Sequence, residues 1–400
     1  MMQQLGFGFD DGVPVVAPAV GGSSRAARQT KPKRPVTLST PGQPRMAAPA
    51  ELSLLGAASD APDAAIAAPL PATPTPAAIS PADDFESLAQ RLEAHADYRV
   101  LRRLVPRLYF EATALASEPA SDSASGSGSL PGSAGIARLL ILDTETTGLN
   151  HARDKIMELA LLRVDVDRAT GQPVGPVLVY DGLEDPGQPI PAEVQAITGI
   201  DDGMVRGQQL DTARIAELLD GVDLVVAHNA GFDRPFVEAR LPAFAAKDWA
   251  CSFADIDWKG EGKGSSKLET LALGLGLFYD AHRAEMDCHA LLAVLQATLP
   301  TAGRSGLARL LQAAPTPRYR LQATGAPFDA KDALKDRGYR WDAVQKVWHT
   351  RLDDAALLDA EAAWLKAEVY GQRAARVQVE TLDAQVRYSG RAGVVEWRVL

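Results

Sequence analysis

The hydrophobic positions of this chain form short continuous runs in its middle part and alternating runs near its end. The continuous runs have the length of buried strands and cover residues 138–142, 155–165, 177–181 and 223–227. Apolar residues at helical spacing predict helices over residues 212–219, 232–240, 267–275 and 284–299. Strands followed by helices indicate an α/β domain with a central sheet over residues 136–300.

Residues 318–400 show a different pattern and predict a small α+β domain, joined to the α/β domain by a linker at residues 301–317. Alternation at period two predicts strands over residues 319–323, 376–388 and 394–399, with a hairpin over 339–350. Helices are expected over residues 329–337 and 353–370.

The first part of the chain lacks apolar periodicity. Residues 1–82 hold 13 of the 27 prolines and are rich in Ala, Ser and Thr, which predicts a disordered tail. Residues 117–135 are rich in Ser and Gly and are expected to form a flexible linker. Between them, apolar residues near helical spacing predict an amphipathic helical segment within residues 83–116, with one or two helices up to Phe110.

Composition narrows the classes of protein that fit. The 400 residues carry a formal net charge of −10, which excludes a basic protein that coats nucleic acid. Two cysteines cannot build a disulfide framework and favour a reducing, cytoplasmic location. No run approaches the roughly 20 apolar residues of a membrane span, so no membrane partner is expected.

Four carboxylates and one histidine stand beside the predicted buried elements. Asp143 and Glu145 come directly after the run 138–142, and positions i and i+2 of a strand point to one face. Asp233 follows the strand 223–227 and a polar turn, at a helix start. His282 and Asp287 lie at the start of the helix 284–299. Taken singly, these could be solvated acids, a helix cap and a loop histidine.

Taken together, the five residues suit phosphodiester hydrolysis. Like charges placed side by side repel unless a cation lies between them, and carboxylate oxygens are the ligands of Mg²⁺ and Mn²⁺. Two such ions can hold a scissile phosphate and activate a water molecule. A histidine such as His282, with an ordinary pKa near 6.5, can take a proton from that water.

Three motifs in order resemble the DEDDh 3′→5′ exonucleases, in particular those like the bacterial DNA polymerase III epsilon (proofreading) subunit. They are DTETTGL at 143–149, HNAGFD at 228–233 and HRAEMD at 282–287, supported by IPAEVQAITGI at 190–200 and KLETLALGL at 267–275. The resemblance covers residues 136–300 and implies a ribonuclease H-like fold with a mixed central sheet. It implies that His282 is the general base and that the metal ligands are Asp143, Glu145, Asp233 and Asp287.

The same resemblance suggests residues near the substrate. The backbone around Thr146 and Thr147 would line the terminal nucleotide. Asn229 and Phe232 would shape the pocket, and His228 would be structural or position the substrate.

The first nine residues contain a second short pattern. Gln4, Leu5, Phe7 and Phe9 resemble the short peptide that binds the bacterial sliding clamp, with a glutamine followed by spaced apolar anchors. The alternative is a chance apolar terminus. A clamp or a polymerase is therefore a candidate partner.

The sequence thus predicts a metal-dependent 3′→5′ exonuclease that releases nucleoside monophosphates from single-stranded or frayed DNA in replication or repair. The first alternative is an exoribonuclease of the same superfamily, because the residues that would read the 2′-OH cannot be located. The second is a non-catalytic adaptor built on the exonuclease fold.

Overall fold

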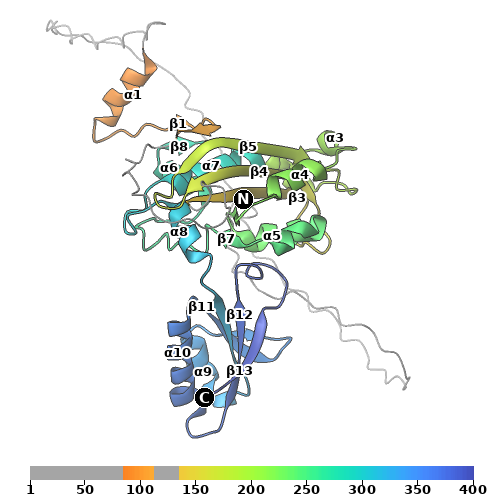
Figure 1. The fold of residues 1–400 in the computed structure, drawn as a ribbon, viewed down its shortest axis with the longest axis vertical. Coiled ribbons are helices and arrows are strands. Elements are labelled where there is room, and N and C mark those ends of the chain that lie inside the picture. Colours follow the sequence, from red (N-terminus) through yellow and green to blue (C-terminus); the bar gives the residue numbers. More distant parts are fainter. Residues whose placement is uncertain (1–83, 112–134) are drawn as a thin grey trace, which may run out of the picture. The chain divides into compact units, whose positions relative to one another are not determined.

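The computed structural model describes residues 84–111 and 135–400 (Figure 1). The predicted tail at 1–82, the peptide with Gln4, Leu5, Phe7 and Phe9, and nearly all of the predicted linker at 117–135 lie outside the described residues. From Ala89 onward, the described residues belong to one compact unit.

A mixed six-stranded sheet forms the centre of the α/β part. Its strands stand in the order β2 (Tyr109–Phe110), β5 (Pro173–Leu183), β4 (Ile156–Asp167), β3 (Ile136–Thr146), β6 (Leu224–Ala227) and β7 (Trp249–Cys251). β3 runs antiparallel to β4 and parallel to β6, and β7 continues in parallel. The expected mixed central sheet is therefore confirmed.

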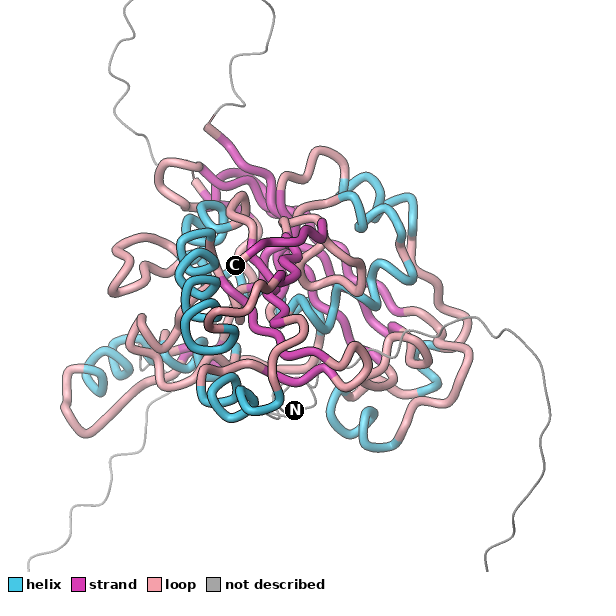
Figure 2. The backbone as a smooth tube through the Cα atoms, turned by 90° about the horizontal axis from the view of Figure 1, so that it is seen from below, coloured by secondary structure: helices cyan, strands magenta, loops and turns pink. Residues whose placement is uncertain are grey.

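Helices cover both faces of this sheet (Figures 1 and 2). On one face, Leu139 and Ile141 of β3 belong to an apolar cluster with α6 (Leu268–Gly274), α7 (Ala284–Gln296) and α8 (Gly306–Ala313). On the other face, Leu140 and Leu142 pack with α4 (Thr212–Leu219) and α5 (Ala230–Arg240). The strand is apolar on both sides because both faces of the sheet are covered.

Shorter helical elements fill the connections. α2 (Ala192–Thr198) and α3 (Asp202–Val205) follow β5, and the Asp201 side chain caps α3 by accepting from two backbone N–H groups. The 3₁₀ helix η1 (Pro242–Ala246) joins α5 to β7. Val194 and Val205 form a small apolar cluster with Met157 of β4.

The helical expectation for residues 83–110 is right only at its start. α1 spans Phe85–Glu93, but β1 (Arg102–Arg103) pairs in parallel with β8 (Leu277–Phe278), and β2 pairs with β5. Backbone hydrogen bonds from Arg102 and Leu104 to the neighbouring strand select the extended conformation. Pro106, which has no backbone N–H, disfavours a continuous helix here.

The C-terminal part is an antiparallel sheet with helices packed on it, as an α+β domain requires. Its strand order is β10 (Arg340–Asp342), β11 (Val347–Leu352), β9 (Arg318–Ala323), β12 (Arg376–Leu382) and β13 (Val394–Val399). The helices are η2 (Phe328–Ala330), α9 (Lys331–Asp336), α10 (Ala355–Trp364) and the π-helical η3 (Leu365–Tyr370).

One strand of this domain ends earlier than the sequence pattern predicts. The alternation suggested a strand up to Tyr388, but β12 stops at Leu382 and the chain turns. Residues 383–391, called loop 383–391 below, form turns and hydrogen bonds with the α/β part instead.

Residues 84–111 and 135–400 contain neither a membrane-spanning helix nor a disulfide. None of their helices has the length and apolar character needed to cross a membrane. Cys251 and Cys288 are both free and buried.

Candidate active site

The register of β3 and β6 brings two of the three motifs to one end of the sheet. Leu139–Leu142 pair in parallel with Leu224–Ala227. Beyond this pairing, Asp143–Thr146 continue β3 along β4, whereas the chain leaves β6 at His228, so the two motifs begin side by side at the same end of the sheet. Local apolar runs set both strands, so each motif is held at the end of a buried element.

Three carboxylates converge at this edge. Asp143 and Glu145 of β3 and Asp287 of α7 are buried, and each offers an oxygen that lies within 4.8 Å of the other two. Divalent cations with a preference for oxygen ligands bind such clusters. The group of three could therefore hold a metal ion.

Asp233, the fourth predicted ligand, lies in the first turn of α5 and is completely buried. Its Oδ1 accepts a hydrogen bond from Thr144 Oγ1 at 2.8 Å. Its Oδ2 is buried without a hydrogen-bond partner among the described residues. A buried carboxylate oxygen without a partner is costly, and a cation would satisfy it. The donor set therefore fits a divalent metal.

Burial and mutual repulsion raise the pKa values of these carboxyl groups. Burial, followed by the charges of its neighbours, raises the pKa of Asp143 well above its usual range. Burial is also the main cause that raises the pKa of Glu145 to about 8, of Asp233 to about 7 and of Asp287 to about 6. The cluster thus needs protons or cations to balance its charge.

Asp287 is oriented by two donors from the segment before α7. The Tyr279 hydroxyl donates to Oδ1 of Asp287, and the backbone N–H of His282 donates to Oδ2, both at 2.8 Å. Sequence reasoning missed Tyr279, because it stands three positions before the third motif and a buried tyrosine carries no catalytic signal by itself.

Sequence reasoning also missed Glu158 and Arg283. Glu158 of β4 is fully buried, and its Oε1 accepts from Arg283 Nη2 at 2.7 Å. It lies opposite Glu145 in the register of β3 and β4. The signal was present, since Glu158 is a charged residue inside the apolar run 155–165, where a buried charge needs a partner.

His282 lies in the turn before α7 with a left-handed backbone (φ 68°). Burial lowers the pKa of its imidazole, which favours the neutral form that can accept a proton. The position is consistent with the expected general base, whose role stays a prediction.

The residues expected near the substrate make contacts within the protein. Thr146 Oγ1 donates to the carbonyl of Gly148 at 2.7 Å, and Thr147 Oγ1 accepts from Gln188 Nε2 at 2.9 Å. These contacts fix the turn after β3. Their roles toward a nucleotide stay predictions.

The second motif is held in a similar way. His228 is buried with Nδ1 2.7 Å from Ser252 Oγ, and burial lowers its pKa to about 4. Asn229 has a left-handed backbone (φ 73°) and begins α5 without a side-chain cap. Phe232 packs against Phe236 with ring centroids 5.2 Å apart. The contacts of His228 and Phe232 fit structural or pocket-shaping roles.

Comparison with known proteins identifies relatives of the chain that carries this site. Residues 140–295 match the family model described as "Exonuclease" (RNase_T). The chain is 32% identical to the DNA polymerase III subunit epsilon of Treponema pallidum over 158 residues, which is 36% of this chain and 68% of that protein. It is 29% identical to the PolC-type DNA polymerase III of Thermotoga maritima over 185 residues, 44% of this chain and 13% of that protein.

Solved structures are also similar in part. Exonuclease X in complex with 5′ overhanging duplex DNA shares 26% identity at a TM-score of 0.33 and covers 43% of this chain and 97% of its own. The Escherichia coli ExoI–ssDNA complex shares 18% identity at a TM-score of 0.36 and covers 47% of this chain and 48% of its own.

The matches to the PolC-type proteins are local, since the chain spans only 7% of the relative from Listeria innocua, with 35% identity over 103 residues. The match to the epsilon subunit extends over most of that relative. The family model covers all three motifs and most of the mixed sheet that presents them, which confirms the expected ribonuclease H-like exonuclease fold. This chain therefore belongs to the exonuclease family that includes the DNA polymerase III epsilon subunits.

Proposed function

We propose that this protein is a metal-dependent 3′→5′ exonuclease that removes nucleoside monophosphates from the 3′ end of DNA. The observation that carries the proposal is the convergence of Asp143, Glu145 and Asp287. Asp233 adds a buried Oδ2 without a hydrogen-bond partner among the described residues, and its charge contributes to the raised pKa of Asp143. A cluster of buried acids has no structural benefit without a cation, and phosphodiester hydrolysis uses such cations.

The four carboxylates Asp143, Glu145, Asp233 and Asp287 would hold two Mg²⁺ or Mn²⁺ ions. When bound, the two ions would neutralise charge on the scissile phosphate and lower the pKa of the attacking water. Tyr279 and the backbone N–H of His282 keep the Asp287 carboxylate oriented. The neutral His282 imidazole would take the proton of the attacking water on a ring nitrogen.

DNA is the proposed substrate because the relatives are a subunit of DNA polymerase III and a PolC-type DNA polymerase III. Thr146, Thr147, His228, Asn229 and Phe232 are the candidates to surround the terminal nucleotide. The exoribonuclease remains the alternative enzyme. The adaptor alternative is disfavoured by the complete set of carboxylates, since a scaffold has no need to keep them buried together.

A role in replication or repair, a cytoplasmic location, and a clamp or polymerase partner stay predictions. The peptide with Gln4, Leu5, Phe7 and Phe9 would provide the contact with a clamp.

The test is a time course with the full chain on 5′-labelled single-stranded DNA and RNA of one sequence, with Mg²⁺ or Mn²⁺. We expect a metal-dependent ladder that shortens from the 3′ end of DNA. Asp143→Asn should lower the rate by at least about 10³-fold. The matched control Asp359→Asn, in an exposed ion pair with Arg398 of the C-terminal domain, should keep the rate.

Three results would separate the alternatives. Faster shortening of RNA would favour the exoribonuclease. Metal-independent degradation would contradict the proposed chemistry. No cleavage of either strand, together with no metal binding, would favour the adaptor.

A further inference from the structure

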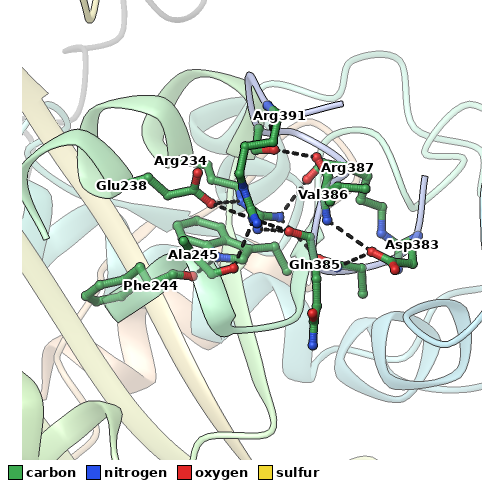
Figure 3. Close-up of polar contacts among 12 residues, drawn as sticks. Arg234, Glu238, Phe244, Ala245, Asp383, Gln385, Val386, Arg387 and Arg391 are labelled. Carbon is green, nitrogen blue, oxygen red and sulfur yellow. Dashed lines mark hydrogen bonds and ion pairs between the residues drawn. The ribbon is translucent and has the colours of Figure 1, made fainter. Parts of the chain in front are cut away.

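The residue after Asp233 is a completely buried arginine. The Arg234 side chain has 0% of its surface exposed, although it lies on the helix α5 that carries Asp233. Its Nε donates to Glu238 Oε1 at 2.6 Å. Its two terminal nitrogens donate to three backbone carbonyls of loop 383–391, and Figure 3 shows two of the acceptor residues, Gln385 and Arg387, beside Arg234. The acceptors are Ala384 at 3.1 Å, Arg387 at 2.7 Å and Gln385.

These acceptors belong to a loop whose shape is set by its own residues. Asp383 Oδ1 accepts from the backbone N–H groups of Gln385 and Val386, at 2.9 and 3.2 Å. This turn aims the following carbonyls toward α5 (Figure 3). Arg391 adds hydrogen bonds to Glu238 Oε1 at 3.2 Å and to the carbonyl of Ala245 at 2.9 Å. The loop is thus fixed at both of its ends.

A second set of contacts links the loop to the first residue of α5. The Tyr388 hydroxyl donates to Oδ1 of Asp255. Oδ2 of Asp255 accepts from the backbone N–H of Cys251 at 2.7 Å, and Cys251 Sγ accepts from the N–H of Ala230 at 3.3 Å. Loop 383–391 therefore supports the segment 230–234 at both of its ends, at Arg234 directly and at Ala230 through Asp255 and Cys251.

The chemistry of the contact makes the loop necessary rather than incidental. A buried guanidinium is costly unless its N–H groups are bonded, and here most acceptors are neutral carbonyls whose placement depends only on the loop conformation. Consecutive Cα atoms are about 3.8 Å apart, so a shift of Arg234 moves Asp233 with it. Metal ligands must be held to within about 0.5 Å.

We propose that loop 383–391 completes the exonuclease site by holding Arg234, which acts as a positioning residue for Asp233. The inference rests on the proposed role of Asp233 as a metal ligand. It assigns a function to the C-terminal domain, and it means that the family-matched residues 140–295 do not contain the whole support of the site.

The experiment compares substitutions in the full chain. Asp383→Ala loosens the loop, and Arg234→Lys keeps the charge but loses the fork that reaches three carbonyls. The matched controls are Asp354→Ala, which removes the cap of α10 in the same domain, and Arg398→Lys, which alters a surface ion pair with Asp359. The readouts are hydrogen–deuterium exchange of residues 230–240 and Mn²⁺ affinity from electron paramagnetic resonance of free Mn²⁺.

We expect both loop-directed variants to exchange faster in residues 230–240 and to bind Mn²⁺ about tenfold more weakly or worse. Both controls should stay within about twofold of the unmodified chain, even if Asp354→Ala lowers the melting temperature. If Arg234→Lys fails to fold, Asp383→Ala decides alone. Unchanged exchange, or unchanged Mn²⁺ affinity, in the loop-directed variants would overturn the inference. Failure of the proposed function is recognised separately, because the unmodified chain would then bind no Mn²⁺.

Discussion

Glu158 and Arg283 form a bidentate ion pair beside the carboxylate cluster, with Arg283 Nη2 and Nε 2.7 and 3.0 Å from Oε1 of Glu158. The backbone N–H of Ala284, the first residue of α7, donates to the other oxygen at 2.9 Å. A fifth acidic residue is therefore neutralised by an arginine and a helix N-terminus rather than by a metal. This leaves the other four carboxylates as the candidates for metal ligands.

Removal of this arginine should destabilise the protein. Arg283→Met leaves the fully buried Glu158 carboxylate without its countercharge, and we expect the free energy of unfolding to fall by about 2–3 kcal/mol, since Arg283 itself is partly exposed. Urea denaturation measures the change. The control is Arg153→Met, whose side chain is 77% exposed and should cost less than about 1 kcal/mol. Equal losses in the two variants would contradict the assignment.

Tyr279 should affect metal binding more than stability. Tyr279→Phe removes the donor to Asp287 Oδ1, and loss of such a supporting hydrogen bond typically costs about tenfold in metal affinity. The unfolding free energy should fall by only about 1 kcal/mol. Titration with Mn²⁺ and the rate of DNA cleavage are the measurements. Tyr370→Phe, which loses a similar bond to the carbonyl of Thr324 at 2.9 Å, should leave both unchanged. A matching loss in Tyr370→Phe would count against a local effect.

Metal stabilisation should grow with pH. The native pKa values of Glu145, about 8, and Asp233, about 7, lie above the ordinary values of 4.5 and 3.8. Without metal, the native state keeps protons that the unfolded chain has released, so stability falls as pH rises from about 4.5 to about 8. Because Mn²⁺ replaces those protons, the rise in melting temperature on adding it should be larger at pH 8 than at pH 6.

Melting curves at both pH values, with Mn²⁺ and with a chelator, test this expectation. In Asp143→Asn the rise should shrink at both pH values, since a proposed ligand has been lost. A rise in the unmodified chain that is smaller at pH 8 than at pH 6 would show that protons and metal do not compete at this cluster.

His228 should make the protein sensitive to acid. Burial lowers its native pKa to about 4 from an ordinary value of 6.5. Between these pH values the imidazole is therefore neutral in the native state and protonated in the unfolded chain. Stability is therefore lost as pH falls below about 6.5. Between pH 7.5 and 5, the free energy of unfolding should fall by about 2 kcal/mol less in His228→Asn than in the unmodified chain. His95→Asn, with a side chain 60% exposed, should keep the original slope.

Much of the α/β part follows from local pattern. The helix over 212–219 has the predicted bounds, and the acids after the apolar runs 138–142 and 223–227 emerge at one sheet edge because β3 and β6 are parallel. The i and i+2 spacing of Asp143 and Glu145 was enough to predict that they meet. Asp287 joins them in one cluster, which the third motif had indicated.

Features that depend on distant partners could not be read in this way. The apolar residues from Leu101 to Leu108 fit a helix, but hydrogen bonds to the segment around Gly276 and to β5 make them extended. The alternation after Arg376 continues through Tyr388, yet β12 ends at Leu382 because the following backbone bonds Arg234. Local pattern carries no information about a partner so far away in sequence.

The separation of Arg234 from its acceptors has a consequence for biosynthesis. Ala384 follows Arg234 by 150 positions in the chain. At about 5–20 residues per second, the ribosome makes those acceptors on the order of 10 s after it has made α5. Until then the arginine has Glu238, the ring of Trp249 and water as partners but lacks the three carbonyls, so the nascent chain carries all three motifs before loop 383–391 can hold Arg234. Completion of the nuclease would thereby be coupled to completion of its C-terminal domain.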